Sequence, residues 1–338
     1  MSGLVSRWGG GVVRVYRVSH AGQPTKEDIS LVRIAITGGA GFIGSNLSAA
    51  ALHAGHEVVI LDDFSTGYRD NVIDGARLVE GTILDREALG DAFSGVDSVV
   101  HLAALGSVPR SIADPFASHA ANATGTLSVL EGARRAGCSH VVAASSSSVY
   151  GLNPALPKSE REWVRPMSPY AVTKLATEQY TLAYQQSYGI DSLAFRFFNV
   201  YGPLQRAGHV YAAVIPIFID ALLRGEALPV NGDGLHSRDF TFVGTVCRVI
   251  LDAVERRVSH PEPVNLAFGT NTTLLELIAR IEAAAGLSAD VVHRALRAGD
   301  VKHSQADNAV LRSLFPDVQP ISLDQGLSET LAWFKEVS

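Results

Sequence analysis

Hydrophobic and polar positions begin a regular alternation of two patterns at residue 31. Short β-branched runs predict strands at residues 32–37, 57–61, 98–102, 140–144 and 192–196, and helical patterns cover residues 42–54, 115–136 and 169–188. The strand runs are apolar at nearly every position, which is typical of parallel strands buried on both faces. The alternation therefore predicts an α/β domain over residues 31–198, built as a doubly wound parallel sheet covered by helices.

The pattern is less regular from residue 199 onward. Loops that contain glycine and proline separate helical patterns near residues 211–224, 273–285 and 323–334. We expect residues 199–338 to form a smaller mixed region that closes over the carboxyl edge of the sheet. We also expect this region to be partly interleaved with the first domain.

Residues 1–30 follow neither pattern. Arg7, Arg14 and Arg17 precede the first acidic residue, and three consecutive glycines at 9–11 interrupt any helical or strand period. An apolar core and a small-residue cleavage site, which a secretory signal needs, are both missing from this stretch. We expect residues 1–30 to be a flexible extension.

Composition narrows the classes of function. Apolar residues make up 47% of the chain and charged residues 18%, where a charged share of roughly 25% is usual. The formal charge of −6, with no Lys/Arg run longer than a pair, argues against nucleic acid or an anionic membrane as a partner. Two cysteines make neither a disulfide framework nor a zinc cluster, and the histidines lack further ligands at metal-site spacing. We expect a cytoplasmic protein with no metal and no membrane span.

A glycine-rich loop occupies residues 37–44 between the first predicted strand and the first predicted helix. Gly38 allows a tight turn, Gly41 lets a diphosphate approach the helix N-terminus, and Gly44 allows close packing of the helix on the strand. Asp62 ends the second predicted strand, where a carboxylate accepts hydrogen bonds from both ribose hydroxyls and repels a 2′-phosphate. The loop and Asp62 together predict a dinucleotide site with a preference for NAD.

Tyr170 and Lys174 form a candidate catalytic pair. They are four residues apart after a Ser-Pro helix start, so both lie on one helix face. A nearby ammonium lowers the pKa of a phenol, and a bound nicotinamide cation would lower it further, so we expect Tyr170 to take a proton from a sugar or alcohol hydroxyl near neutral pH. Four serines at 145–148 end an earlier predicted strand, and strand ends of this kind face the cofactor crevice.

These motifs resemble those of the extended short-chain dehydrogenase/reductases, specifically the nucleotide-sugar epimerases. The resemblance runs from about residue 32 to the end and rests on TGGAGFIG at 37–44, HLAALGSVPRSI at 101–112, SSSSVYG at 145–151, SPYAVTK at 168–174, FFNVYGP at 197–203, NGDGLHSRDF at 231–240 and RAGDVKHS at 297–304. It implies a Rossmann domain that holds NAD tightly and a C-terminal region that binds a UDP-sugar. It also implies a homodimer built on the two long helices of the first domain.

The resemblance implies roles for individual residues. Catalysis would fall to Tyr170, Lys174 and Ser146; the cofactor would contact Gly38, Gly41, Phe42, Ile43, Gly44, Asp62, Ala103 and Lys174; and the substrate would contact Ser107, Arg110, Ser147, Asn199, Arg206, Arg238, Arg297, Asp300 and Ser304. Asn199 and Arg238 are expected at the diphosphate, where an arginine fork donates two parallel hydrogen bonds. Arg297 and Asp300 are expected at phosphate and at the uridine ribose.

The reaction type depends on acidic residues that related enzymes carry and that the SSSSVYG motif at 145–151 does not contain. Family dehydratases carry an Asp-Glu pair after the active-site hydroxyl, and decarboxylases carry a glutamate at the position of Ser148. Without those acids the resemblance implies a 4-epimerase, which oxidises C4 to a transient ketone and returns the hydride to the other face. An NAD-dependent dehydratase or oxidoreductase of the same family is the further alternative.

The identity of the sugar depends on two positions. Ser304 stands where glucose/galactose-restricted epimerases have a bulky tyrosine, so room remains for a 2-acetamido group. Arg206 matches an arginine that glucuronate 4-epimerases use for the sugar carboxylate. We expect a UDP-N-acetylglucosamine-type substrate, with UDP-glucose as a possible second substrate and UDP-glucuronate as the alternative. Sugars of this kind serve polysaccharide and antibiotic biosynthesis.

Overall fold

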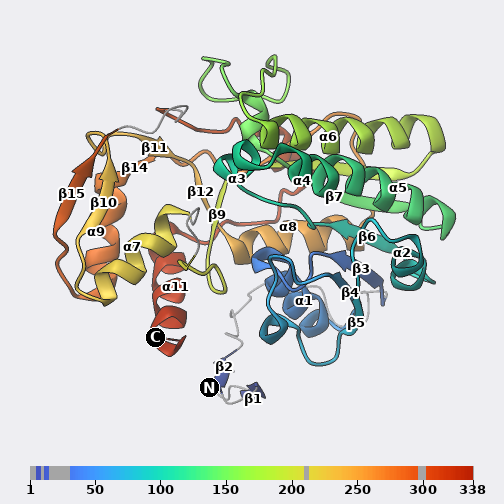
Figure 1. The fold of residues 1–338 in the computed structure, drawn as a ribbon, viewed down its shortest axis with the longest axis horizontal. Helices are drawn as coiled ribbons and strands as arrows, with labels where there is room; N and C mark the ends of the chain where they lie inside the picture. Colours follow the sequence, from blue (N-terminus) through green and yellow to red (C-terminus); the bar gives the residue numbers. More distant parts are fainter. Residues whose placement is uncertain (1–4, 9–10, 15–30, 209–212, 296–301, 338) are drawn as a thin grey trace.

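A seven-stranded parallel sheet forms the centre of the protein (Figure 1). The computed structural model describes residues 5–8, 11–14, 31–208, 213–295 and 302–337. The order across the sheet is β13 (Val264–Leu266), β8 (Asp191–Phe197), β7 (His140–Ser146), β6 (Ser98–His101), β3 (Arg33–Thr37), β4 (Glu57–Asp62) and β5 (Arg77–Glu80). The order reverses direction between β3 and β6, and at such a point the carboxyl ends of the strands open a ligand crevice. The predicted doubly wound fold is confirmed.

The two faces of the sheet bury two separate apolar cores. One contains Ile34 and Ile60 of the sheet together with α1 (Phe42–Ala54) and α8 (Val243–Glu255). The other core is formed by the alternate side chains of the same strands, which point to the opposite face of the sheet. They pack against α2 (Arg86–Phe93), α5 (Gly125–Arg135) and α6 (Pro169–Tyr188). Successive strand residues point to opposite faces, so a continuous apolar strand supplies both cores.

The predicted single helix over residues 115–136 is wrong in its interior. α4 (Pro115–His119) and α5 are separated by a five-residue π-helical segment, η2 (Ala120–Thr124). Asn122 in this segment is buried, and its side chain binds partners on two other elements. The wider turn is therefore associated with a polar anchor inside the protein, a common use of π turns.

Among the described residues, the C-terminal region carries three two-stranded sheets and its own helices. Its strand pairs are β9 (Asn199–Tyr201) with β12 (Phe240–Phe242), β10 (Leu228–Asn231) with β15 (Val291–Arg294), and β11 (Ser237–Arg238) with β14 (Thr272–Thr273). Its helices are α7 (Val214–Leu223), α9 (Leu274–Ala285), α10 (Ala309–Leu314) and α11 (Leu323–Val337). Figure 1 shows most of this region on one side of the central sheet. β13 and α8 also lie beyond residue 199, yet they belong to the central sheet and its covering layer.

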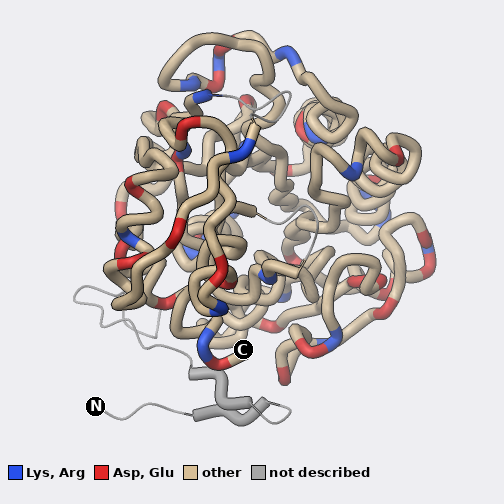
Figure 2. Tube along the Cα trace, turned by 60° about the vertical axis from the view of Figure 1, so that its left-hand side comes forward, with Lys and Arg blue, Asp and Glu red and all other residues tan. Residues whose placement is uncertain are grey.

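Two short strands, β1 (Val5–Trp8) and β2 (Gly11–Arg14), pair antiparallel within the predicted N-terminal extension and form a sheet of their own. Across the described part of the chain, Lys and Arg alternate with Asp and Glu, without a broad region of one sign in the view of Figure 2. Among the same residues, each helix is either too short or too polar to cross a bilayer.

Candidate active site

The glycine loop between β3 and α1 is shaped for a diphosphate. Gly38 has φ of 72°, and a Cβ placed there would lie 2.7 Å from the backbone nitrogen of Ala103. A Cβ on Gly44 would collide with the carbonyl oxygen of Gly38. α1 starts at Phe42 with no side-chain cap and no acidic residue in its first turn. The amides of this turn are therefore left to an anion, as a bound dinucleotide requires.

Asp62 lies at the end of β4 beside this loop. It is 7% exposed, and its carboxylate accepts hydrogen bonds from the amides of Ala40 and Phe64, both at 2.9 Å. Burial raises the pKa of Asp62, and these two amides oppose the rise. The carboxylate is held in place with acceptor capacity left for ribose hydroxyls. Asp63 instead accepts from the amide of Ser65 in a local turn.

The structure brings Ser146, Tyr170 and Lys174 together at the ends of β7 and the start of α6. Ser168 caps α6 by accepting from the amide of Ala171 at 3.1 Å. The Tyr170 hydroxyl is hydrogen-bonded to Ser146, at the carboxyl end of β7. Lys174 is buried, and its Nζ donates to the carbonyl of Ala144 at 2.8 Å.

Burial controls the charges of this centre. It raises the pKa of the Tyr170 phenol, and the hydrogen bond with Ser146 only partly opposes the rise. It lowers the pKa of Lys174 to about 8. The prediction that the Lys174 ammonium lowers the pKa of Tyr170 is therefore wrong when only the protein's own side chains are considered. Desolvation of the phenolate raises this pKa and is the dominant effect. Tyr170 is a neutral phenol at neutral pH in this arrangement.

A buried polar network behind the centre was not predicted from the sequence. Asn122 binds the backbone of Leu105 through both amide atoms, at 2.8 and 3.2 Å, and donates to the Thr173 hydroxyl at 3.0 Å. His101 bridges Thr37 at 2.8 Å and Thr126 at 3.0 Å. Burial and the charge of Lys174 lower the pKa of His101 to about 3, so its imidazole is neutral. The network ties the loop after β6 to the helix that carries Tyr170.

One turn after Lys174, a buried ion pair fixes α6 to the sheet. Arg196 of β8 donates twice to Glu178, at 2.8 and 2.9 Å, and both side chains are almost wholly buried. The Ser145 hydroxyl lies within 3.1 Å of Glu178 and 3.2 Å of the Lys174 carbonyl. Strand β7, strand β8 and helix α6 therefore meet in one hydrogen-bonded unit next to the candidate catalytic residues.

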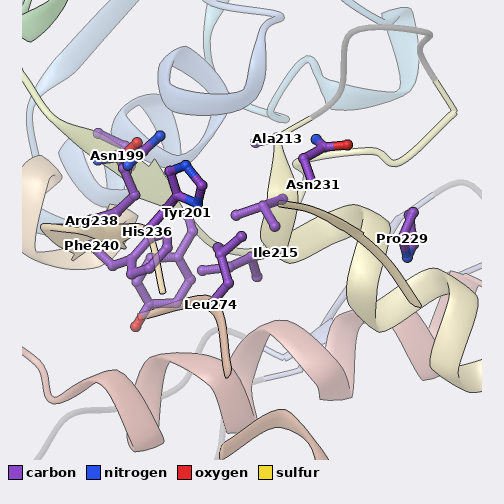
Figure 3. Close-up of a pocket in the computed structure, with 12 residues that line it drawn as sticks. Asn199, Tyr201, Ala213, Ile215, Pro229, Asn231, His236, Arg238, Phe240 and Leu274 are labelled. Atoms are coloured by element: carbon purple, nitrogen blue, oxygen red, sulfur yellow. The ribbon is translucent and has the colours of Figure 1, made fainter. Parts of the chain in front are cut away.

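A cavity of about 270 Å³ lies on the C-terminal side and is lined by two of the predicted substrate residues, Asn199 and Arg238 (Figure 3). Asn199 donates to the carbonyl of Asp239 at 3.2 Å. The Arg238 guanidinium donates to the carbonyls of Ser237 and Lys302, at 2.9 and 3.3 Å. His236 and Tyr201 also line the cavity and were not predicted, although His236 lies two residues before Arg238 in the NGDGLHSRDF motif.

Other predicted substrate residues fall on several elements. Ser304 is half-buried, and its amide donates to the carbonyl of Ser237 at 3.1 Å, which places it beside Arg238. Ser107 caps α3 (Val108–Ala113) by accepting from the amide of Arg110 at 3.1 Å.

Four further positions complete the predicted set, and two of them lie within the described residues. Ser147 begins the short 3₁₀ segment η3 (Ser147–Tyr150) that follows β7. Arg206 stacks its guanidinium over the ring of Tyr68, 3.9 Å from the ring centre. Arg297 and Asp300 lie outside the described residues.

The fold and this centre define a dinucleotide-dependent enzyme with a Ser-Tyr-Lys group at the carboxyl edge of its sheet. A model of the NAD dependent epimerase/dehydratase family matches residues 34–267. The chain belongs to this family, and NAD as the cofactor is confirmed. Within the described residues, no group of three or more potential metal ligands comes together.

Characterised relatives span nearly the whole chain. A UDP-glucose 4-epimerase of Mycolicibacterium smegmatis is 37% identical over 91% of this chain and all of its own. A UDP-N-acetylglucosamine 4-epimerase of Methanobrevibacter ruminantium, solved with UDP-N-acetylmuramic acid, has a TM-score of 0.87 and 34% identity over 92% of this chain and all of its own. MoeE5, solved with UDP-glucuronic acid and NAD, has a TM-score of 0.80 and 32% identity over 90% of this chain and all of its own.

Proposed function

We propose that this protein is an NAD-dependent UDP-sugar 4-epimerase whose substrate is of the UDP-N-acetylglucosamine type. The observation that carries the proposal is the hydrogen-bonded Ser146–Tyr170 pair beside Lys174, at a strand end whose own residues, 145–148, are all serines. Ser147 and Ser148 stand where an acid would be needed to expel water or carbon dioxide. Oxidation and reduction at one carbon therefore remain as the supported chemistry.

Tyr170, Ser146 and Lys174 have different roles in the proposed proton transfer. Tyr170 takes the proton of the C4 hydroxyl, and Ser146 holds the same oxygen by sharing its hydrogen bond. Lys174 is anchored on the Ala144 carbonyl, and its ammonium would hold the nicotinamide ribose of bound NAD. Bound NAD would supply the hydride acceptor and donor for C4, and its positive charge would offset the raised pKa of Tyr170 and favour the phenolate form that takes this proton. Tyr170 then returns the proton to the inverted hydroxyl.

Ser304 supports an N-acetylated sugar. Its backbone amide is bonded to Ser237, the neighbour of Arg238, and by the resemblance its short side chain stands where a bulky tyrosine would exclude a 2-acetamido group. Arg206, which would favour glucuronate, stacks on Tyr68 beside the cofactor loop rather than on a group of the catalytic centre. This position supports the N-acetyl sugar over the glucuronate alternative.

Ser304→Tyr should lower kcat/KM for UDP-N-acetylglucosamine about 10- to 100-fold, because a bulky ring would occupy the space of the acetamido group. Turnover of UDP-glucose, which lacks that group, should change much less. Steady-state assays with both sugars measure the ratio. Ser328→Tyr on the exposed side of α11 is the matched control. An unchanged ratio in Ser304→Tyr would remove Ser304 from sugar selection.

The proposed activity itself is tested with the three sugars supplied separately. Purified protein is incubated with UDP-N-acetylglucosamine, UDP-glucose or UDP-glucuronate without added NAD, and the C4 configuration is followed by proton NMR. Conversion of the N-acetyl sugar would support the proposal, whereas conversion of glucuronate alone would overturn the choice of sugar. Absence of conversion of all three, even after NAD is added, would overturn the 4-epimerase assignment for these substrates.

We also propose a homodimer through the helices α3, α4 and α6. Ile112, Phe116 and Val172 on these neighbouring helices are 66%, 87% and 54% exposed. Figure 1 shows the three helices side by side. Large exposed apolar side chains on adjacent helices are typical of a surface that another protein covers, and we infer that a second copy of this chain covers it.

Phe116→Glu should convert the dimer to a monomer, because it places a charge in the middle of the apolar face. Light scattering coupled to size exclusion measures the mass in solution. Leu287→Glu alters an exposed apolar residue on the C-terminal region and is the control that should leave the dimer intact. A monomeric wild-type protein would contradict the proposal.

A reducing compartment is consistent with the cysteines. Cys138 and Cys247 are both buried and unpaired with one another. Burial raises the pKa of Cys138 and raises that of Cys247 to about 12, which keeps both as unreactive thiols. These features support the proposed cytoplasmic location.

A further inference from the structure

The loop after β9 is fastened to the cofactor half of the protein. The side-chain amide of Asn46, in the first turns of α1, donates to the carbonyl of Pro203 at 3.0 Å. The next residue, Leu204, has φ of 69°, a left-handed conformation that a branched residue rarely adopts. A strained residue between two fixed contacts indicates that the loop is held in a defined place.

A second contact fastens the same loop three residues further on. The exposed Arg206 lies over the half-buried ring of Tyr68, with 3.9 Å from the guanidinium carbon to the ring centre. An arginine in this position is attracted by the negative face of the ring.

Tyr68 lies next to the glycine loop of residues 37–44. Its amide donates to the carbonyl of Ala40 at 3.1 Å. A Cβ on the preceding Gly67 would lie 2.8 Å from Asp62 Oδ1 and 3.1 Å from Ala40, so the turn packs directly on the glycine loop and on the predicted ribose ligand. The Tyr68 ring therefore connects Arg206 to both elements that bind the dinucleotide.

We propose that Arg206 retains the cofactor: stacked on Tyr68, it holds residues 203–206 across the N-terminus of α1 and slows the departure of the NAD diphosphate. Pro203 is bonded to Asn46 of α1, and Arg206 is stacked on Tyr68, whose amide is bonded to Ala40 of the glycine loop, so both ends of the segment are fixed to elements of the dinucleotide site. The guanidinium adds a positive charge suited to phosphate oxygens. This assignment replaces the sugar carboxylate as the partner of Arg206.

The inference depends on NAD binding, which the family establishes, and not on which sugar is epimerised. It gives the loop a purpose in the proposed reaction, because an enzyme that returns its hydride to the same molecule gains from keeping NAD through many turnovers. The sugar assays and the cofactor assay can therefore fail separately.

The test measures NAD itself. Wild type, Arg206→Ala, Tyr68→Ala and the double variant are purified alike, and their NAD content is determined after acid release. The release rate is then followed on dilution into an enzyme that destroys free NAD. We expect at least about tenfold faster release in each single variant, the size of effect that loss of a cation–π contact and a phosphate charge produces. KM for UDP-sugars at saturating NAD should stay within about twofold.

The controls separate retention from general damage. Arg161→Ala removes another exposed arginine, 83% exposed in its side chain, and should release NAD like the wild type. Tyr68→Phe keeps the ring and should release NAD more slowly than Tyr68→Ala. The double variant should be little worse than either single variant, because both act through one contact.

Two results would overturn the assignment. One is wild-type release of NAD by Arg206→Ala, whatever the KM; a raised KM for UDP-glucuronate or another UDP-sugar would in addition return Arg206 to the sugar site. The other is additive acceleration in the double variant, which would show that the residues do not act as a pair.

Discussion

Tyr170→Phe should lower kcat between about 10²- and 10⁴-fold while the protein still carries NAD, because it removes one hydroxyl from the centre. The ring and the helix start stay in place, since the cap of α6 is made by Ser168 and not by Tyr170. The proton of the C4 hydroxyl then has no positioned acceptor. Single-turnover measurement of hydride transfer, read at the NADH absorbance band, separates this loss from effects on binding.

The control for this prediction is on the same helix. Tyr180→Phe removes the hydroxyl of an exposed tyrosine on α6, ten residues away from the centre, and should keep full activity. Ser146→Ala should fall between the two, because Tyr170 remains but loses the hydrogen bond that favours its ionised form. Tyr170→Phe with more than a tenth of wild-type kcat would exclude Tyr170 as the base.

Elements with local end signals could be predicted closely from the sequence. α1 and α6 begin and end at the predicted residues, since a glycine loop and a Ser-Pro pair mark their starts and left-handed glycines, Gly55 and Gly189, mark their ends. β5 was missed because only Val79 of its four residues is buried, which gives almost no apolar signal at this edge of the sheet. α2, α8 and β13 were missed as well.

α8 did carry a readable signal. Its apolar residues recur at three- and four-residue steps, and its buried face packs on α1. The irregular region expected from residue 199 onward did not include this helix, although the spacing of its apolar residues indicates one. β13 has three residues only and depends on pairing with β8 for its place in the sheet. Tertiary pairing, which no short window contains, decides such elements.

The residues of the candidate active site also differ in how well they can be predicted from local sequence. Tyr170 and Lys174 are recognisable because four residues of helix bring them to one face. Asn122 and Thr173 are 51 residues apart, and Glu178 and Arg196 sit on different elements, so their meeting depends on the finished fold. The error on the pKa of Tyr170 has the same origin, because the depth of burial of a phenol follows from packing and not from the spacing of its neighbours.

Lys174→Met should make the NAD-free protein more stable at pH 7 while lowering its activity. Burial lowers the pKa of Lys174 from 10.5 to about 8. At neutral pH the Lys174 side chain is therefore charged in both states, but its charge is less favourable in the folded protein than in the unfolded chain. This difference in pKa lowers the free energy of unfolding of the wild type by about 3 kcal/mol. Lys174→Met removes that cost, but it also removes the hydrogen bond to Ala144, which is worth about 1 kcal/mol. The free energy of unfolding should therefore rise by about 2 kcal/mol.

The pH dependence identifies the cause of this gain. Below pH 8 the full cost is present in the wild type; from pH 8 to 10.5 the unfolded chain binds more protons than the folded one, so wild-type stability rises with pH relative to the variant. The advantage of Lys174→Met should thus shrink through this window and vanish near its upper end, as measured by urea unfolding at several pH values. Lys335→Met, at an exposed lysine of α11, should show no such trend. A variant less stable than the wild type at pH 7 would mean that Lys174 stabilises the fold, and its burial would then not be a cost accepted for catalysis.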